Sequence, residues 1–181
     1  MPGLLEEVVQ VRREQDRLAF WYVLHLTLTW ATPLSSGRLA QLLRKRAKAM
    51  LEGAKWRYER GEYDLACFEA EQAAQLGLKA LLHELLGRAP GTYSLTELSG
   101  VLRNLLVEAE LDELVKRLSD FVMEFRKDLW VLEEAYYRGR YGFVEYDAEE
   151  AKRCIRIAKN LLKLLEEVRD EIRKGSPSDL P

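Results

Sequence analysis

The residues with the clearest potential for chemistry are tyrosines and arginines that cluster near the end of the chain. This cluster comprises Tyr136, Tyr137, Arg138, Arg140, Tyr141 and Tyr146. A guanidinium group can bind a phosphate through two hydrogen bonds, and a tyrosine ring can stack on a base. We therefore predict a contact site for a nucleotide or single-stranded RNA, formed by Arg138, Arg140, Tyr141 and Tyr137. The alternative is that these side chains close the fold, with arginines packed over tyrosine rings.

Other kinds of site have little support in the sequence. His25 and His83 are the two histidines of the chain, so a histidine-rich metal site is excluded by number. A di-iron carboxylate site would need Glu-x-x-His motifs, and the chain has none. Glycine-rich phosphate loops, nucleophile elbows and zinc-ligand spacings are also missing from the sequence. We expect no metal and no cofactor.

The two cysteines, Cys67 and Cys154, are far apart in the sequence and neither belongs to a Cys-x-x-Cys motif. That spacing argues against a zinc ribbon and against a thioredoxin-like redox site. We predict two buried thiols in a reducing compartment, with a single disulfide between two helices as the alternative.

Composition describes one soluble domain with a charged surface. The chain has 181 residues, of which 48% are hydrophobic and 32% charged, and its formal charge is −2. This length is enough to enclose one core, and no overall positive charge attracts the protein to nucleic acid. The basic run Arg44-Lys45-Arg46 is interpreted as the solvated side of a helix, with RNA contact as the alternative.

An apolar run between Leu18 and Ala31 raises the question of a membrane span or a signal peptide. It is shorter than the roughly 20 residues that a spanning helix needs, and it is interrupted by His25, Thr27 and Thr29. The residues before it include acidic side chains, which a signal peptide disfavours. We expect a cytoplasmic protein without a membrane partner. Alternating apolar residues between 22 and 30 leave open whether the segment is helix or strand, and it is expected to cover a helix face or a dimer surface.

The remaining pattern is helical. Apolar residues recur at intervals of three and four in the ranges 38–60, 62–86 and 111–136, and capping-box pairs open two more helices at Ser94 and at Asp147. The helix at 62–86 is apolar around most of its circumference, so we place it at the centre of a bundle. The segment 136–146 is predicted to be a loop. This organisation divides the chain into an N-terminal extension (1–37) made of a helix and the apolar segment, a helical domain (38–174) and a frayed tail (175–181).

The central helix also carries a family resemblance. The run Tyr63-Asp64-Leu65-Ala66-Cys67-Phe68-Glu69-Ala70-Glu71-Gln72-Ala73-Ala74, followed by Leu78-Lys79-Ala80-Leu81-Leu82, resembles the central helix of HEPN domains. Tyr93-Ser94-Leu95 is similar to the start of the family's next helix. Arg140-Tyr141, followed by a helix start at Tyr146-Asp147, is similar to the family's arginine-tyrosine-proline loop. The resemblance covers about residues 40 to 170.

The resemblance implies an all-α, up-and-down bundle of four to five helices, here with an extra N-terminal segment. Relatives are usually homodimers and often pair with a minimal nucleotidyltransferase, in some cases as toxin-antitoxin systems. Ribonucleases of the family use an arginine and a histidine separated by four to six residues, and no arginine here precedes a histidine at that spacing.

Without that histidine, the chain lacks the side chain best suited to acid-base catalysis near neutral pH. We therefore favour a non-catalytic module that binds a nucleotide or a nucleotidyltransferase partner. The alternatives are a ribonuclease with an atypical site, using Arg140 with Tyr141 or Glu145, and a purely structural or regulatory dimer.

Overall fold

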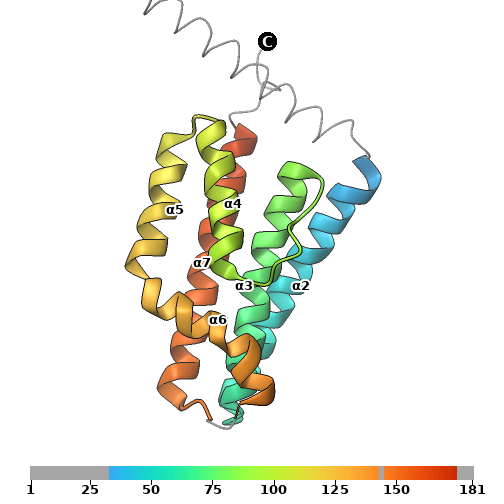
Figure 1. The fold of residues 1–181 in the computed structure, drawn as a ribbon. Coiled ribbons are helices and arrows are strands. Elements are labelled where there is room, and N and C mark those ends of the chain that lie inside the picture. The colour runs from blue at the N-terminus through green and yellow to red at the C-terminus, as the bar shows by residue number, and fades with distance from the viewer. Residues whose placement is uncertain (1–32, 143–144, 175–181) are drawn as a thin grey trace, which may run out of the picture.

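The computed structural model describes residues 33–142 and 145–174, and all the regular structure in these ranges is α-helical (Figure 1). The helices are α2 (Pro33–Glu59), α3 (Tyr63–Leu86), α4 (Leu95–Glu108), α5 (Asp112–Glu124), α6 (Arg126–Tyr141) and α7 (Ala148–Lys174). The long helices α2, α3 and α7 run along the bundle, and α4 and α5 form a hairpin beside α7 (Figure 1). The predicted all-α helical bundle is confirmed.

Helix α3 is the inner helix of the bundle, as its composition predicted. It contacts α2, α4, α6 and α7. Its small buried residues are Ala66, Ala70, Ala73, Ala74, Gly77 and Ala80. Because these side chains are small, neighbouring helices can approach closely, and a Cβ atom at Gly77 would collide with Leu162 of α7.

Both predicted capping boxes open helices. The hydroxyl oxygen of Ser94 accepts a hydrogen bond from the Glu97 backbone N–H at 3.1 Å, which caps α4. At α7 the exchange is reciprocal: Asp147 Oδ1 accepts from the Glu150 N–H at 2.8 Å, and Glu150 Oε2 accepts from the Asp147 N–H at 3.1 Å. These bonds satisfy backbone donors that have no partner within the helix.

The single helix predicted for 111–136 and the loop predicted for 136–146 were both wrong in detail. Phe125 leaves the helical conformation with φ −101° and ψ 18°, which divides the segment into α5 and α6. After this break α6 crosses the lower part of the bundle and packs on α3 (Figure 1). Helix α6 then continues to Tyr141, although it contains Gly139. A Cβ atom at Gly139 would lie 2.8 Å from the Asp64 carbonyl oxygen, so this close packing requires glycine.

At its N-terminal end the described chain begins in α2 at Pro33, five residues earlier than the predicted start at Arg38. Proline suits a first helical turn because its missing N–H would have no helical partner there. The apolar segment 18–31 and the tail 175–181 lie outside the described residues. Within the described ranges, no helix combines the length and the hydropathy that crossing a bilayer requires.

A buried ion-pair cluster joins α2, α3 and α7. The carboxylate of Glu84, whose side chain is 6% exposed, pairs with Arg44 of α2 and with Arg169 and Arg173 of α7. Arg44 therefore does not belong to a solvated stripe, as its basic neighbours had suggested, but turns inward and is 20% exposed. Sequence periodicity assigns a residue to a helix face, but whether a buried carboxylate lies opposite that face depends on tertiary packing.

Candidate functional site

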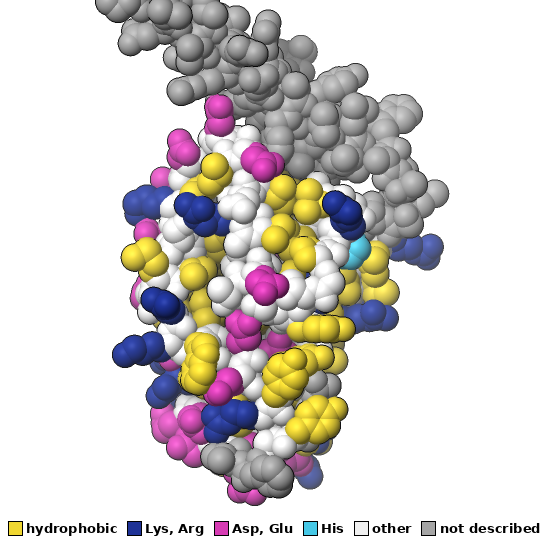
Figure 2. Space-filling model, viewed as in Figure 1, with side chains coloured by type: hydrophobic (Ala, Val, Ile, Leu, Met, Phe, Trp, Pro, Cys, Tyr) yellow, Lys and Arg dark blue, Asp and Glu magenta, His cyan; other side chains and the backbone are white. Residues whose placement is uncertain are grey.

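A group of tyrosines lies on the surface where α6 meets the start of α4. We call Tyr93, Tyr136 and Tyr137 the tyrosine face. The rings of Tyr93 and Tyr136 are stacked with centroids 5.3 Å apart, and Tyr137 meets Tyr136 edge-on at 5.0 Å. Tyr93 is 54% exposed and Tyr137 is 67% exposed. Figure 2 shows flat hydrophobic side chains gathered on the lower part of this face of the molecule.

Lys79 supplies a positive charge beside these rings. Its Nζ lies 4.7 Å from the centroid of the Tyr93 ring, within the range of a cation–π contact. Lys79, Gln75 and Glu71 are spaced four residues apart on α3, so they form one stripe along the helix. Burial lowers the pKa of Lys79, while the negative charge of Glu71 and the nearby Tyr136 act in the opposite direction.

A chain of hydrogen bonds holds Tyr93 in position. Gln75 is buried, and its Nε2 donates both to Glu71 Oε1 at 3.1 Å and to the Tyr93 carbonyl oxygen at 3.4 Å. On the other side, Glu133 of α6 accepts a hydrogen bond from the Thr96 hydroxyl at 3.0 Å, which ties the start of α4 to α6. The tyrosine face is thus built on three helices and has limited freedom to rearrange.

Arg138, which follows Tyr137 on α6, packs against other side chains of the protein. Its Cζ is 4.6 Å from the centroid of the Tyr146 ring, and its Nη1 is 3.3 Å from Glu134 Oε2. Tyr146 is 3% exposed, and its backbone N–H donates to Asp64 Oδ1 at 2.7 Å. Burial raises the pKa of Tyr146, and the Arg138 charge opposes that effect. This is the packing arrangement of arginine over tyrosine that was the alternative to ligand binding.

The structure brings the four residues predicted from sequence into different surroundings. Tyr137 belongs to the tyrosine face, and Tyr141 is 73% exposed at the end of α6. Arg138 is engaged with Tyr146 and Glu134. The Arg140 side chain lies outside the described part of the structure.

The sequence-based prediction missed Tyr93 and Lys79. A signal for both existed, since Lys79 lies in the central-helix motif and Tyr93 directly precedes a capping box. However, only the crossing of α6 over α3 brings them beside Tyr136.

The cysteines and the acidic side chains offer no second site of this kind. Cys67 and Cys154 are free and buried, as predicted. Their side chains share a hydrogen bond that, together with burial, raises the pKa of the Cys67 thiol. Among the residues described, no group of three histidine, cysteine or acidic side chains could hold a metal ion.

Comparison with known proteins agrees with this architecture. The family model of the HEPN domain matches residues 40–168, which is most of the chain. The chain belongs to the HEPN family. The crystal structure of TT1696 from Thermus thermophilus is similar to this HEPN chain, with a TM-score of 0.50 and 26% identity over 71% of this chain and 96% of that one. The comparison with curated proteins returned no match.

The HEPN match covers the whole tyrosine face. Of the Glu84 cluster it covers Glu84 and Arg44, whereas Arg169 and Arg173 lie just beyond it. Residues 40–168 include most of α2, the whole of α3 to α6 and most of α7. The tyrosine face therefore lies within the residues that match the HEPN family.

Proposed function

We propose that this HEPN chain is a non-catalytic module that binds a nucleotide through its tyrosine face. The observation that carries the proposal is the exposed pair of rings, Tyr93 and Tyr137, held against Tyr136 with Lys79 alongside. A base can stack on an exposed ring, and an ammonium group 4.7 Å from that ring can neutralise an attached phosphate.

The same geometry supports a role for Tyr137 and Tyr141 over one for Arg138. Both tyrosines are exposed, whereas the arginine is occupied by internal contacts. The contact residues predicted from sequence therefore have different roles in this proposal. Tyr137 contacts the base, Tyr141 lies near the edge of the site, and Arg138 packs against the protein without contacting the ligand. Arg140 remains a predicted contact.

The test is isothermal titration calorimetry of the protein with AMP and with GMP. We expect Tyr137→Ala to weaken binding by about 5- to 150-fold, because stacking on a base contributes about 1 to 3 kcal/mol. Tyr137→Phe keeps the ring and should retain most of the affinity. Trp130→Ala is the matched control, since Trp130 is 62% exposed and lies outside the tyrosine face.

Three results would overturn the proposal. If neither nucleotide binds, or if Trp130→Ala weakens binding as much as Tyr137→Ala, the tyrosine face is not a nucleotide site. If the protein cleaves RNA and Arg140→Ala abolishes the cleavage, the atypical ribonuclease becomes the function. Absence of the family's arginine and histidine spacing supports the non-catalytic proposal.

The proposal includes a homodimer and a minimal nucleotidyltransferase partner, in a toxin-antitoxin-like pair. Membership of the HEPN family supports both partners. Helix α2 also has exposed apolar side chains, namely Leu39, Leu42, Met50 and Trp56, which would suit a symmetric contact. Sedimentation of the wild type and of Leu42→Glu tests the dimer, because a charge at the contact should shift the protein to monomer.

A further inference from the structure

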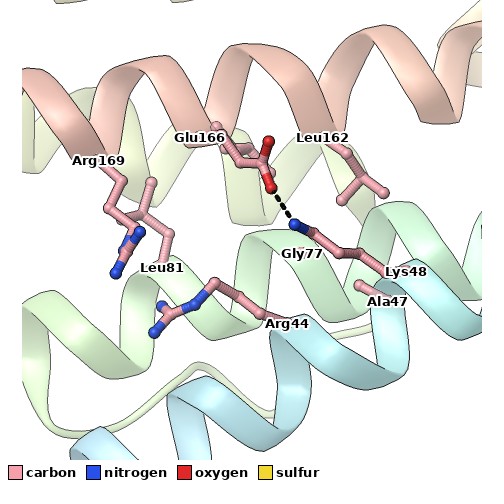
Figure 3. A pocket seen from close by; sticks show the side chains of 9 residues that line it. Arg44, Ala47, Lys48, Gly77, Leu81, Leu162, Glu166 and Arg169 are labelled. Atoms are coloured by element: carbon pink, nitrogen blue, oxygen red, sulfur yellow. Dashed lines mark ion pairs between the residues drawn. The ribbon is translucent and has the colours of Figure 1, made fainter.

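A pocket with a basic opening lies between α2, α3 and α7, away from the tyrosine face. Its apolar side chains include Ala47 of α2, Leu81 of α3, and Leu162 and Leu165 of α7. Arg44 and Lys48 of α2, and Glu166 and Arg169 of α7, surround these apolar residues. Figure 3 shows Arg44 and Arg169 reaching toward each other across α3, near Leu81.

Cations outnumber carboxylates around this pocket. Arg44, Arg169 and Arg173 share the buried carboxylate of Glu84. The other acidic partners are Asp170, which is 60% exposed and 3.6 Å from Arg169 Nη1, and Glu166, which is 49% exposed and 2.6 Å from Lys48 Nζ. Four cations therefore face three carboxylates, and two of the three carboxylates are well solvated.

The two arginines at the pocket also have donors beyond those that bind carboxylates. A guanidinium group has five N–H donors in a fixed plane. The ion pairs at Glu84 and Asp170 use Nη1 of Arg44 and both Nε and Nη1 of Arg169. Because Arg44 and Arg169 are only 20% and 21% exposed, water screens their charge incompletely, and an additional anion would be bound favourably.

The volume and the apolar lining of the pocket restrict the part of the ligand that lies beyond its anionic group. The cavity has a volume of about 30 Å³, which is room for about two water molecules or a short alkyl group. Its apolar lining favours the alkyl group, because ordered water would find few polar partners there. The Lys48–Glu166 ion pair crosses the opening between α2 and α7, so the ligand must enter beside it (Figure 3).

We propose that this pocket binds a small amphipathic anion, in which a carboxylate or phosphate group meets Arg44 and Arg169 and a short alkyl chain lies against Leu81 and Leu162. The inference is independent of the tyrosine face, since the two sites share no residue. Lys48 contributes attraction for the anion at the opening.

The first experiment needs only the wild-type protein. Its melting temperature is measured with butanoate, butyl phosphate, inorganic phosphate and 1-butanol, at matched ionic strength. We expect one or both of the alkyl anions to raise the melting temperature by about 3 °C or more at ten times the dissociation constant. Inorganic phosphate and 1-butanol should each have a smaller effect, because each lacks one half of the proposed ligand.

The variants then locate the site. Lys48→Gln is compared with Lys159→Gln, which removes the same charge from an exposed position on α7 that does not line the pocket. We expect binding to weaken several-fold in Lys48→Gln and to be unchanged in Lys159→Gln. Arg169→Gln should weaken binding at least tenfold, because it removes a charge-assisted hydrogen bond to the anion.

Several outcomes would overturn the proposal, and they do not depend on the folding of the arginine variant. If neither alkyl anion raises the melting temperature above that of the salt-matched control, the pocket is not a binding site. If inorganic phosphate acts as strongly as butyl phosphate, the site is not amphipathic. If Lys159→Gln weakens binding as much as Lys48→Gln, the anions act through overall charge. A larger effect of butanoate than of butyl phosphate identifies a carboxylate ligand, and the reverse a phosphate ester.

Discussion

Replacing Glu84 with glutamine should destabilise the protein more than any exposed charge substitution. Glutamine has nearly the same shape but no charge, so Arg44, Arg169 and Arg173 would lose the carboxylate on which they converge. Breaking a fully buried ion pair costs about 3 to 5 kcal/mol. Arg173 is 54% exposed and the other two arginines are about one-fifth exposed, so hydration of their charges in the variant would offset part of that cost. We therefore expect a loss of about 2 to 4 kcal/mol.

Urea unfolding and thermal unfolding measure this loss. For a chain of this size, 1 kcal/mol corresponds to a fall of about 2 to 4 °C, so the melting temperature of Glu84→Gln should fall by about 4 to 16 °C. The control is Glu166→Gln, which removes a carboxylate from an ion pair whose side chains are 68% and 49% exposed. That change should cost less than about 1 kcal/mol.

Equal stability losses in the two variants would refute the reasoning. In that case the Glu84 cluster would contribute no more than a surface ion pair, and burial of the carboxylate would not matter. A double-mutant cycle with Glu84→Gln and Arg169→Gln measures the interaction free energy between these two side chains. We expect a value of at least about 1 kcal/mol.

Three further predictions concern the helix ends, the helix contacts and the thiols. Ser94→Ala should cost about 1 kcal/mol in urea unfolding, because it removes the oxygen that caps α4, and an unchanged midpoint would contradict that role. Gly139→Ala should cost about 1 to 3 kcal/mol in the same assay, because its Cβ would lie 2.8 Å from the Asp64 carbonyl oxygen. The raised pKa of Cys67 stabilises the fold below the pKa of an unfolded thiol, about 8.5, and this stability is lost as pH rises above it. The free energy of unfolding should thus fall between about pH 8 and pH 10, and Cys67→Ala should flatten that dependence.

The sequence by itself determined the helical class, the central position of α3 and the starts of two helices. Local chemistry explains each success. A helix with apolar residues around most of its circumference must be surrounded, and a capping box places its hydrogen-bond partners within three residues of each other. The buried face of α3 and the bonds at Ser94 and Asp147 follow from such short-range rules.

Tertiary structure alone decided which residues meet at the tyrosine face and at the Glu84 cluster. The break at Phe125 turns α6 across α3, and this crossing places Tyr136 beside Tyr93, 43 positions earlier in the chain. Likewise, Arg44 lies opposite Glu84 because α2 packs on α3, although its neighbours in sequence suggested a solvated stripe. Periodicity describes one helix at a time, whereas these contacts depend on where and at what angle two helices cross.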